Sequence, residues 1–130
     1  MYRPVPDLTI TNSKRMTTPK VDLEIFDTKR TFEDLGLNDS LARSAKELGF
    51  VHPTIIQSKL IPLALSKVDV LGQSRTGSGK TAAFGLPALH LLEEGDAFGA
   101  LILVPTRELA IQVAKEIEVL GKFTNLKAVP

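Results

Sequence analysis

Eight residues near the middle of the chain, which read Ser-Arg-Thr-Gly-Ser-Gly-Lys-Thr from Ser74 to Thr81, constrain the fold more than any other feature. They follow a short apolar run and precede a helix-like run. The glycines allow main-chain N–H groups to turn toward phosphate oxygens, Lys80 adds a positive charge, and the Thr81 hydroxyl is a ligand suited to Mg²⁺. The following helix would point its positive N-terminus at the same phosphates. This pattern predicts a P-loop; the alternative is a flexible Gly/Ser surface loop that ends in a lysine.

The composition is that of a small globular domain. The chain has 130 residues, a net charge of +1 and no cysteine. This length is enough for one domain with a core, and the small charge leaves any nucleic-acid contact to local groups. The absence of thiols fits a reducing compartment. The Met1–Pro6 segment lacks the apolar block of a secretory signal, and no apolar run is long enough to span a membrane. We therefore expect an intracellular protein of the cytoplasm, nucleus or nucleolus that makes no membrane contact.

Residues 1–30 differ from the rest of the chain, because they contain three prolines and show no sustained apolar period. We expect an extended or disordered N-terminal segment. Its basic residues suit contact with RNA or a localisation receptor, although a solvated tail is the alternative: Lys14, Arg15, Lys20, Lys29 and Arg30.

Helical periodicity and capping residues predict four helical segments after this lead-in. The first begins at Asn38 or Asp39 and ends at Gly49. The second begins near Thr54 and should break at Pro62. The third covers residues 80–92, with a kink at Pro87, and the fourth covers residues 107–121.

Three short apolar runs predict β-strands at Val68–Leu71, Ala100–Val104 and Leu126–Val129. Strands that alternate with helices are typical of an open α/β fold with a parallel sheet.

Two further motifs flank the P-loop. The first, Gly-Phe-Val-His-Pro-Thr-Ile-Ile-Gln, ends at Gln57, and Phe32 lies 17 residues upstream of its first residue. The second, Pro-Thr-Arg-Glu-Leu-Ala, begins at Pro105. Together with the P-loop, these motifs resemble the Q motif, motif I and motif Ia of the DEAD-box ATP-dependent RNA helicases. The resemblance implies that residues 31–130 are the N-terminal part of a first RecA-like domain, an open parallel sheet with flanking helices.

The resemblance also implies an adenine pocket. Gln57 would hydrogen-bond the adenine edge, because an amide offers both a donor and an acceptor. Phe32 would stack on the base, and Phe50 and Thr54 would shape the pocket. Without the resemblance, a surface glutamine and two core phenylalanines are the alternative.

ATP and Mg²⁺ are the implied cofactors of the whole loop, including Arg75 and Thr76. Lys80 would bind the β and γ phosphates and Thr81 would ligate magnesium, so these two are the expected catalytic residues. Backbone N–H groups would come from Gly77, Ser78 and Gly79. Ser74 stands where the family usually has alanine, and Arg75 where it usually has glutamine or lysine.

Thr106 and Arg107 resemble the family residues that contact the sugar-phosphate backbone of RNA. They open a predicted helix, where free N–H groups and the helix dipole favour a phosphate. The alternative is that Thr106 is an N-cap and Arg107 a solvated charge.

The family's Asp-Glu-Ala-Asp and Ser-Ala-Thr motifs do not occur in these 130 residues. Phosphoryl transfer needs an acidic group near the metal and cations on the developing charge. We therefore expect the N-terminal portion of an ATP-dependent RNA helicase, inactive by itself, whose intact parent couples ATP hydrolysis to RNA unwinding or remodelling with possible protein cofactors. A non-catalytic ATP- or RNA-binding module and a different P-loop NTPase are the alternatives.

Overall fold

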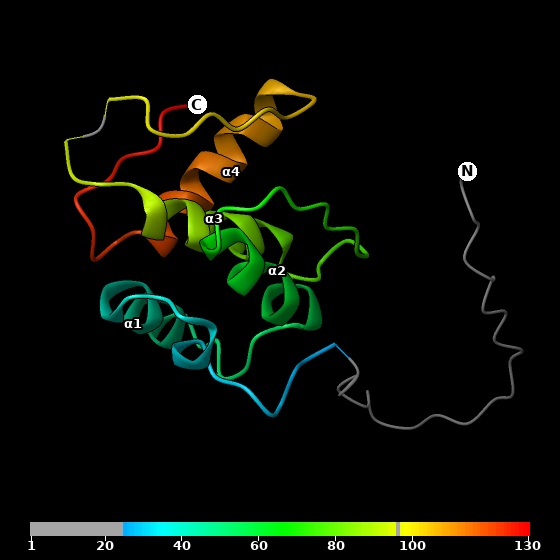
Figure 1. Cartoon of the computed structure of the whole chain (residues 1–130). Coiled ribbons are helices and arrows are strands. Elements are labelled where there is room, and N and C mark those ends of the chain that lie inside the picture. Colours follow the sequence, from blue (N-terminus) through cyan, green and yellow to red (C-terminus); the bar gives the residue numbers. More distant parts are fainter. Residues whose placement is uncertain (1–24, 96) are drawn as a thin grey trace, which may run out of the picture.

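The structure, a computed structural model, describes residues 25–95 and 97–130. Within these ranges it has a 3₁₀ turn η1 (Glu33–Leu35) and four α-helices: α1 (Asp39–Glu47), α2 (Ile55–Leu65), α3 (Lys80–Leu91) and α4 (Arg107–Leu120). Helix α3 lies at the centre, packs most extensively on α2, and contacts α4 and α1 (Figure 1). The predicted disordered lead-in falls mainly in residues 1–24, outside the described residues.

The helices begin where their capping residues predict. The Asn38 side chain accepts a hydrogen bond from the Leu41 N–H at 3.0 Å, and the Thr106 hydroxyl accepts one from the Leu109 N–H at 3.2 Å. At the start of α2, Thr54 and Gln57 form a reciprocal capping box. These bonds satisfy N–H groups that have no partner in the first turn of a helix, so three of the predicted helix starts are confirmed.

The predicted break of the second helix at Pro62 is wrong, because α2 continues to Leu65. Proline removes the N–H that would bond to the carbonyl four residues earlier, here that of Ser58. The Arg30 guanidinium donates to this carbonyl instead, at 3.3 Å. A partner distant in sequence thus replaces the lost helical bond.

The three predicted strands are also wrong for the described residues. The one β-bridge in these residues is an isolated antiparallel pair, Phe26 with Thr54. The three apolar runs have no regular secondary structure and no ladder bonds, and Leu71, Leu101 and Leu103 are 85–100% exposed. A strand requires a hydrogen-bonded neighbour, and no backbone bond joins these runs to one another. The parallel sheet of the predicted α/β fold is therefore absent from this part of the chain.

The core lies between the helices. The apolar period of the second helix predicts Ile56 and Leu60 as its inward residues, but both are half-buried and Ile61 is buried instead. Leu41 of α1, Ile61 of α2 and Leu86 of α3 are fully buried, and Ile117 of α4 packs against them. A Cβ at Gly85 would lie 2.5 Å from the Ile117 methyl, so glycine allows α3 to approach α4 closely. None of the helices in the described ranges has the length and apolar character needed to cross a bilayer.

Candidate nucleotide-binding site

Two glycines give the loop before α3 its shape. Gly77 and Gly79 have φ angles of 75° and 79°, in the left-handed region that favours glycine. Gly79 is the N-cap of α3, and a Cβ added there would collide with the side-chain nitrogen of Gln57. The loop therefore meets the start of α3 in a conformation that residues with a side chain rarely adopt.

Gln57 joins the start of α2 to this loop. Its side-chain oxygen accepts from the Thr54 N–H at 2.9 Å, and its side-chain nitrogen donates to the Gly79 carbonyl at 3.1 Å. An amide group has two N–H donors and two lone pairs, so each end keeps one site for another partner. The side chain is 3% exposed, which makes it a buried connection between two segments 22 residues apart.

A second contact holds the start of α2 from the other side. The Ser58 hydroxyl bonds to the Asp27 carboxylate at 2.5 Å, and the Asp27 N–H donates to the Pro53 carbonyl at 2.8 Å. The Ser58 bond lowers the pKa of Asp27, with smaller contributions from the Lys29 N–H and the Arg30 charge. Sequence analysis missed Asp27, because no local pattern indicates a contact across 31 residues.

The two aromatic residues predicted for the base lie together but differ in exposure. The Phe32 and Phe50 rings are stacked, with centroids 6.0 Å apart and an angle of 30° between planes. Phe32 is 3% exposed and belongs to the core, whereas Phe50 is 37% exposed. Phe50, rather than Phe32, therefore presents an accessible ring in this structure.

The polar groups of the loop bond to one another. The Lys80 ammonium donates to the Ser74 carbonyl, and the hydroxyls of Ser74 and Ser78 are 2.5 Å apart. Arg75 and Thr76 are exposed at the tip. The phosphate-binding groups predicted from the sequence are thus gathered in one place.

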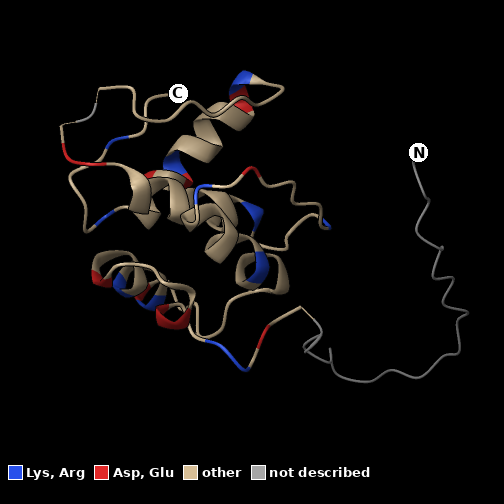
Figure 2. Cartoon of the chain, in the orientation of Figure 1, with Lys and Arg blue, Asp and Glu red and all other residues tan. Residues whose placement is uncertain are grey.

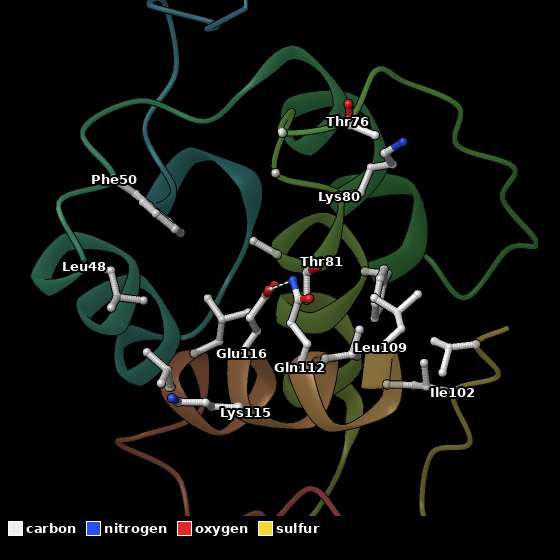
Figure 3. Close-up of a pocket in the computed structure, with 18 of the residues that line it drawn as sticks. Leu48, Phe50, Thr76, Lys80, Thr81, Ile102, Leu109, Gln112, Lys115 and Glu116 are labelled. Atoms are coloured by element: carbon white, nitrogen blue, oxygen red, sulfur yellow. Dashed lines mark hydrogen bonds between the residues drawn. The ribbon is translucent and has the colours of Figure 1, made fainter. Parts of the chain in front are cut away.

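A cavity of about 880 Å³ adjoins the loop. Loop and α3 residues form one side, among them Thr76, Lys80 and Thr81, and apolar residues of α4 and of segment 102–104 form much of the other. Figure 3 shows Lys80 and Thr76 at one end, away from α4, and Thr81 facing Gln112. Gln112 donates to Glu116 at 3.0 Å. The lining of the cavity is mostly apolar, and its charged groups include Lys80, Lys115 and Glu116.

Thr106 and Arg107 lie apart from this loop, at the start of α4, and both are exposed. Thr106 caps the helix, as the alternative interpretation of this residue as an N-cap predicts. Its contact with RNA stays a prediction. Lys and Arg are spread over several elements (Figure 2). The RNA contact therefore stays a prediction based on the two residues themselves.

Comparison with known proteins shows which family the chain resembles. The sequence model of the DEAD/DEAH box helicase family matches residues 54–129. The "ATP-dependent rRNA helicase rrp-3" of Neurospora crassa is 49% identical over 105 residues, which cover 80% of this chain and 20% of that protein.

Solved structures show the same likeness. The RNA helicase Prp28 of Chaetomium thermophilum bound to ADP is 39% identical, with a TM-score of 0.67 over 75% of this chain and 25% of its own. Dbp5 of S. cerevisiae bound to RNA and ADP BeF3 is 35% identical, with a TM-score of 0.61 over 72% of this chain and 25% of its own. The described helices thus have the arrangement found in RecA-like helicase domains, and the chain spans about a fifth to a quarter of the length of these proteins.

Proposed function

The chain belongs to the DEAD/DEAH box helicase family, and on that premise we propose that Phe32 and residues of the segment 50–81 bind the magnesium complex of an adenine nucleotide. The observation that carries this proposal is the bond from Gln57 to the Gly79 carbonyl. It places the residue that would select the base directly against the loop that would hold the phosphates.

The loop fits a polyphosphate by its shape and its donors. The surroundings of Gly77 are open, since a Cβ there would have no atom within 4 Å. Gly79 begins a helix of 12 residues, whose first N–H groups and dipole favour an anion. Lys80 would neutralise phosphate charge, and the half-buried Thr81 hydroxyl would hold Mg²⁺ together with the nucleotide's own oxygens. Among the described residues no group of three or more His, Cys, Asp or Glu could hold a metal.

The free donor and acceptor of Gln57 would select adenine over guanine. Adenine presents an amino donor beside a ring-nitrogen acceptor, whereas guanine has a carbonyl oxygen in place of that amino group and would leave the Gln57 acceptor unpaired. Base stacking on Phe32 remains part of the proposal, and in this structure the exposed Phe50 ring covers it. Phe50 would therefore meet the base first, unless the pair rearranges to expose Phe32.

For the full-length protein we propose ATP hydrolysis coupled to RNA remodelling. A relative is named as an ATP-dependent rRNA helicase, and Dbp5 has been solved with both RNA and ADP BeF3. The Mg²⁺–nucleotide complex supplies the phosphoryl group for hydrolysis. Residues 1–130 would bind and orient it, while the acidic and arginine groups that phosphoryl transfer requires would come from elsewhere in the full-length protein.

Replacing the loop lysine tests the nucleotide site. We expect Lys80→Ala to abolish ATP turnover by the full-length protein, because it removes the charge on the β and γ phosphates. Lys59→Ala is the matched control, since Lys59 is an exposed lysine of α2 that does not line the cavity beside the loop, and it should behave as wild type. If Lys80→Ala kept its turnover within about threefold of wild type, the P-loop role would be excluded.

Replacing Arg107 tests the RNA contact. We expect Arg107→Ala to weaken binding of single-stranded RNA equally for different base sequences, because phosphate contacts carry no sequence information. The slope of log K against log salt should fall by about 0.7 for one lost phosphate contact. Lys59→Ala again serves as the control. An unchanged salt slope in Arg107→Ala would leave Arg107 as a solvated charge.

A further inference from the structure

Two contacts, both made by Ser74, join three residues of the phosphate loop. The Ser74 and Ser78 hydroxyls are 2.5 Å apart, across four positions of the chain. The Lys80 ammonium donates to the Ser74 carbonyl. Ser74 thus makes two connections, one through its side chain to the loop and one through its backbone to the lysine. We call these three residues the serine latch.

The serine latch competes with a bound phosphate. In this structure the Lys80 ammonium donates one of its three N–H groups to the Ser74 carbonyl, and a phosphate that enters the loop would compete with that carbonyl for the lysine. Ser78 lies between the two left-handed glycines whose backbone shapes the cradle, so a bond on its side chain restricts the same segment. A protein whose binding-competent state is only fractionally populated binds its ligand more weakly by that fraction. Any bond that favours the closed loop therefore lowers the apparent affinity.

The side-chain half of the latch depends on the residue type at position 74. An alanine there has no hydroxyl and could not bond to Ser78, whereas the Lys80 contact uses a backbone carbonyl and would survive that change. Both serines are half-buried, so water screens their bond less than it would at a fully exposed site.

We propose that Ser74 is a positioning residue that, through Ser78, holds the nucleotide-free phosphate loop closed and so weakens nucleotide binding. This inference rests on the proposed nucleotide site. Ser74 acts on the loop and does not itself contact the nucleotide in this account.

A double-mutant cycle in the full-length protein tests the latch, with the dissociation constant for magnesium–ADP as the readout. Ser74→Ala and Ser78→Ala should each bind ADP about threefold to tenfold more tightly than wild type, the size of one net hydrogen bond. The double variant should gain no more than either single variant, because both remove the same bond. Ser40→Ala in α1 is the control and should leave the affinity unchanged.

Three results would overturn the proposal. The first is weaker ADP binding by Ser74→Ala, which would mean that the hydroxyl contacts the nucleotide, and the second is an unchanged dissociation constant in either single variant. The third is a double variant whose gain in affinity equals the product of the two single gains. Amide hydrogen exchange of residues 75–79 without nucleotide provides a separate readout. It should be faster in both single variants. If the wild-type protein failed to bind ADP, the proposed nucleotide site would be refuted. The latch would be refuted separately if hydrogen exchange of residues 75–79 were the same in the single variants as in wild type.

Discussion

At the scale of single residues, Gln57 shows how one side chain serves both structure and recognition. Its oxygen caps α2 through the Thr54 N–H, and its nitrogen supports the loop through Gly79. The sequence predicts a helix start near Thr54 and a base contact for Gln57, whereas the capping box between these two residues is seen in the structure. The contact with Gly79 was not predictable from local pattern, because it depends on how α2 packs on α3.

Ser44 is a buried residue whose hydroxyl has no hydrogen-bond partner in the described part of the chain. A buried hydroxyl without a partner costs about 1–3 kcal/mol, and alanine is the better helix former. We expect Ser44→Ala to raise the free energy of unfolding by about 1 kcal/mol, as measured by denaturant unfolding.

Ser40→Ala, one turn earlier in the same helix but only half-buried, is the matched control. Its effect should stay within about 0.5 kcal/mol. Destabilisation by Ser44→Ala would mean that the hydroxyl is bonded, and it would contradict the assignment of Ser44 as unsatisfied.

At the scale of elements, a charged cluster joins α1 to the segment that follows α4. Glu47 accepts from the Lys122 ammonium and from Arg43 at 3.2 Å, and Arg43 lies 4.0 Å from the centre of the Phe123 ring. The hydrogen bond from Lys122 lowers the pKa of Glu47, helped by the Lys122 charge and by Arg43. Periodicity predicts both helices, but it cannot predict this bond across 75 residues.

The lowered pKa of Glu47 predicts how stability depends on pH. A carboxyl whose folded pKa lies below its unfolded value of about 4.3 stabilises the fold above that pH and loses this effect as the pH falls through the folded pKa. We expect Glu47→Gln to be less stable than wild type at pH 6 and the difference to shrink toward pH 3, in denaturant unfolding.

Glu118→Gln, at an exposed glutamate of α4, is the control for loss of a surface carboxylate and should be as stable as wild type at pH 6. A difference between Glu47→Gln and wild type that stays constant from pH 6 to pH 3 would show that the Lys122 contact does not stabilise the fold.

At the scale of the whole molecule, the sequence pattern predicted the helices. It did not predict strand pairing, the place of Pro62 within α2 or the burial of Phe32, which depend on residues far away in the sequence. Capping residues located the starts of α1, α2 and α4, because a cap is encoded within a few residues. The apolar stripe is correct for α1 and α4 but not for α2, where Ile61 is buried rather than Ile56 and Leu60. Apolar runs such as residues 100–104 were read as strands, yet a run encodes only a tendency to be buried and not a neighbour to pair with. Likewise Pro62 stays inside α2 through the distant Arg30, and the burial of Phe32 follows from packing against the core.

The candidate site divides in the same way. The loop, its glycines and its lysine were predictable, because residue type alone determines left-handed turns and charge. The bond between Ser74 and Ser78 and the stacking of Phe50 on Phe32 depend on three-dimensional contacts, which the sequence pattern does not encode. The loop contacts and the position of Phe50 would both affect how a nucleotide enters the site. Base selectivity is therefore the property that tests the proposed site most directly.

Competition between nucleotides tests the central claim most directly. Unlabelled ATP and GTP would each be titrated, with Mg²⁺, against a fluorescent ADP bound to the full-length protein. The account predicts that ATP displaces the probe at a concentration at least about tenfold lower than GTP, because Gln57 has one free donor and one free acceptor beside the loop. Equal displacement by the two nucleotides would contradict the assignment of Gln57 and, with it, the proposed adenine nucleotide site.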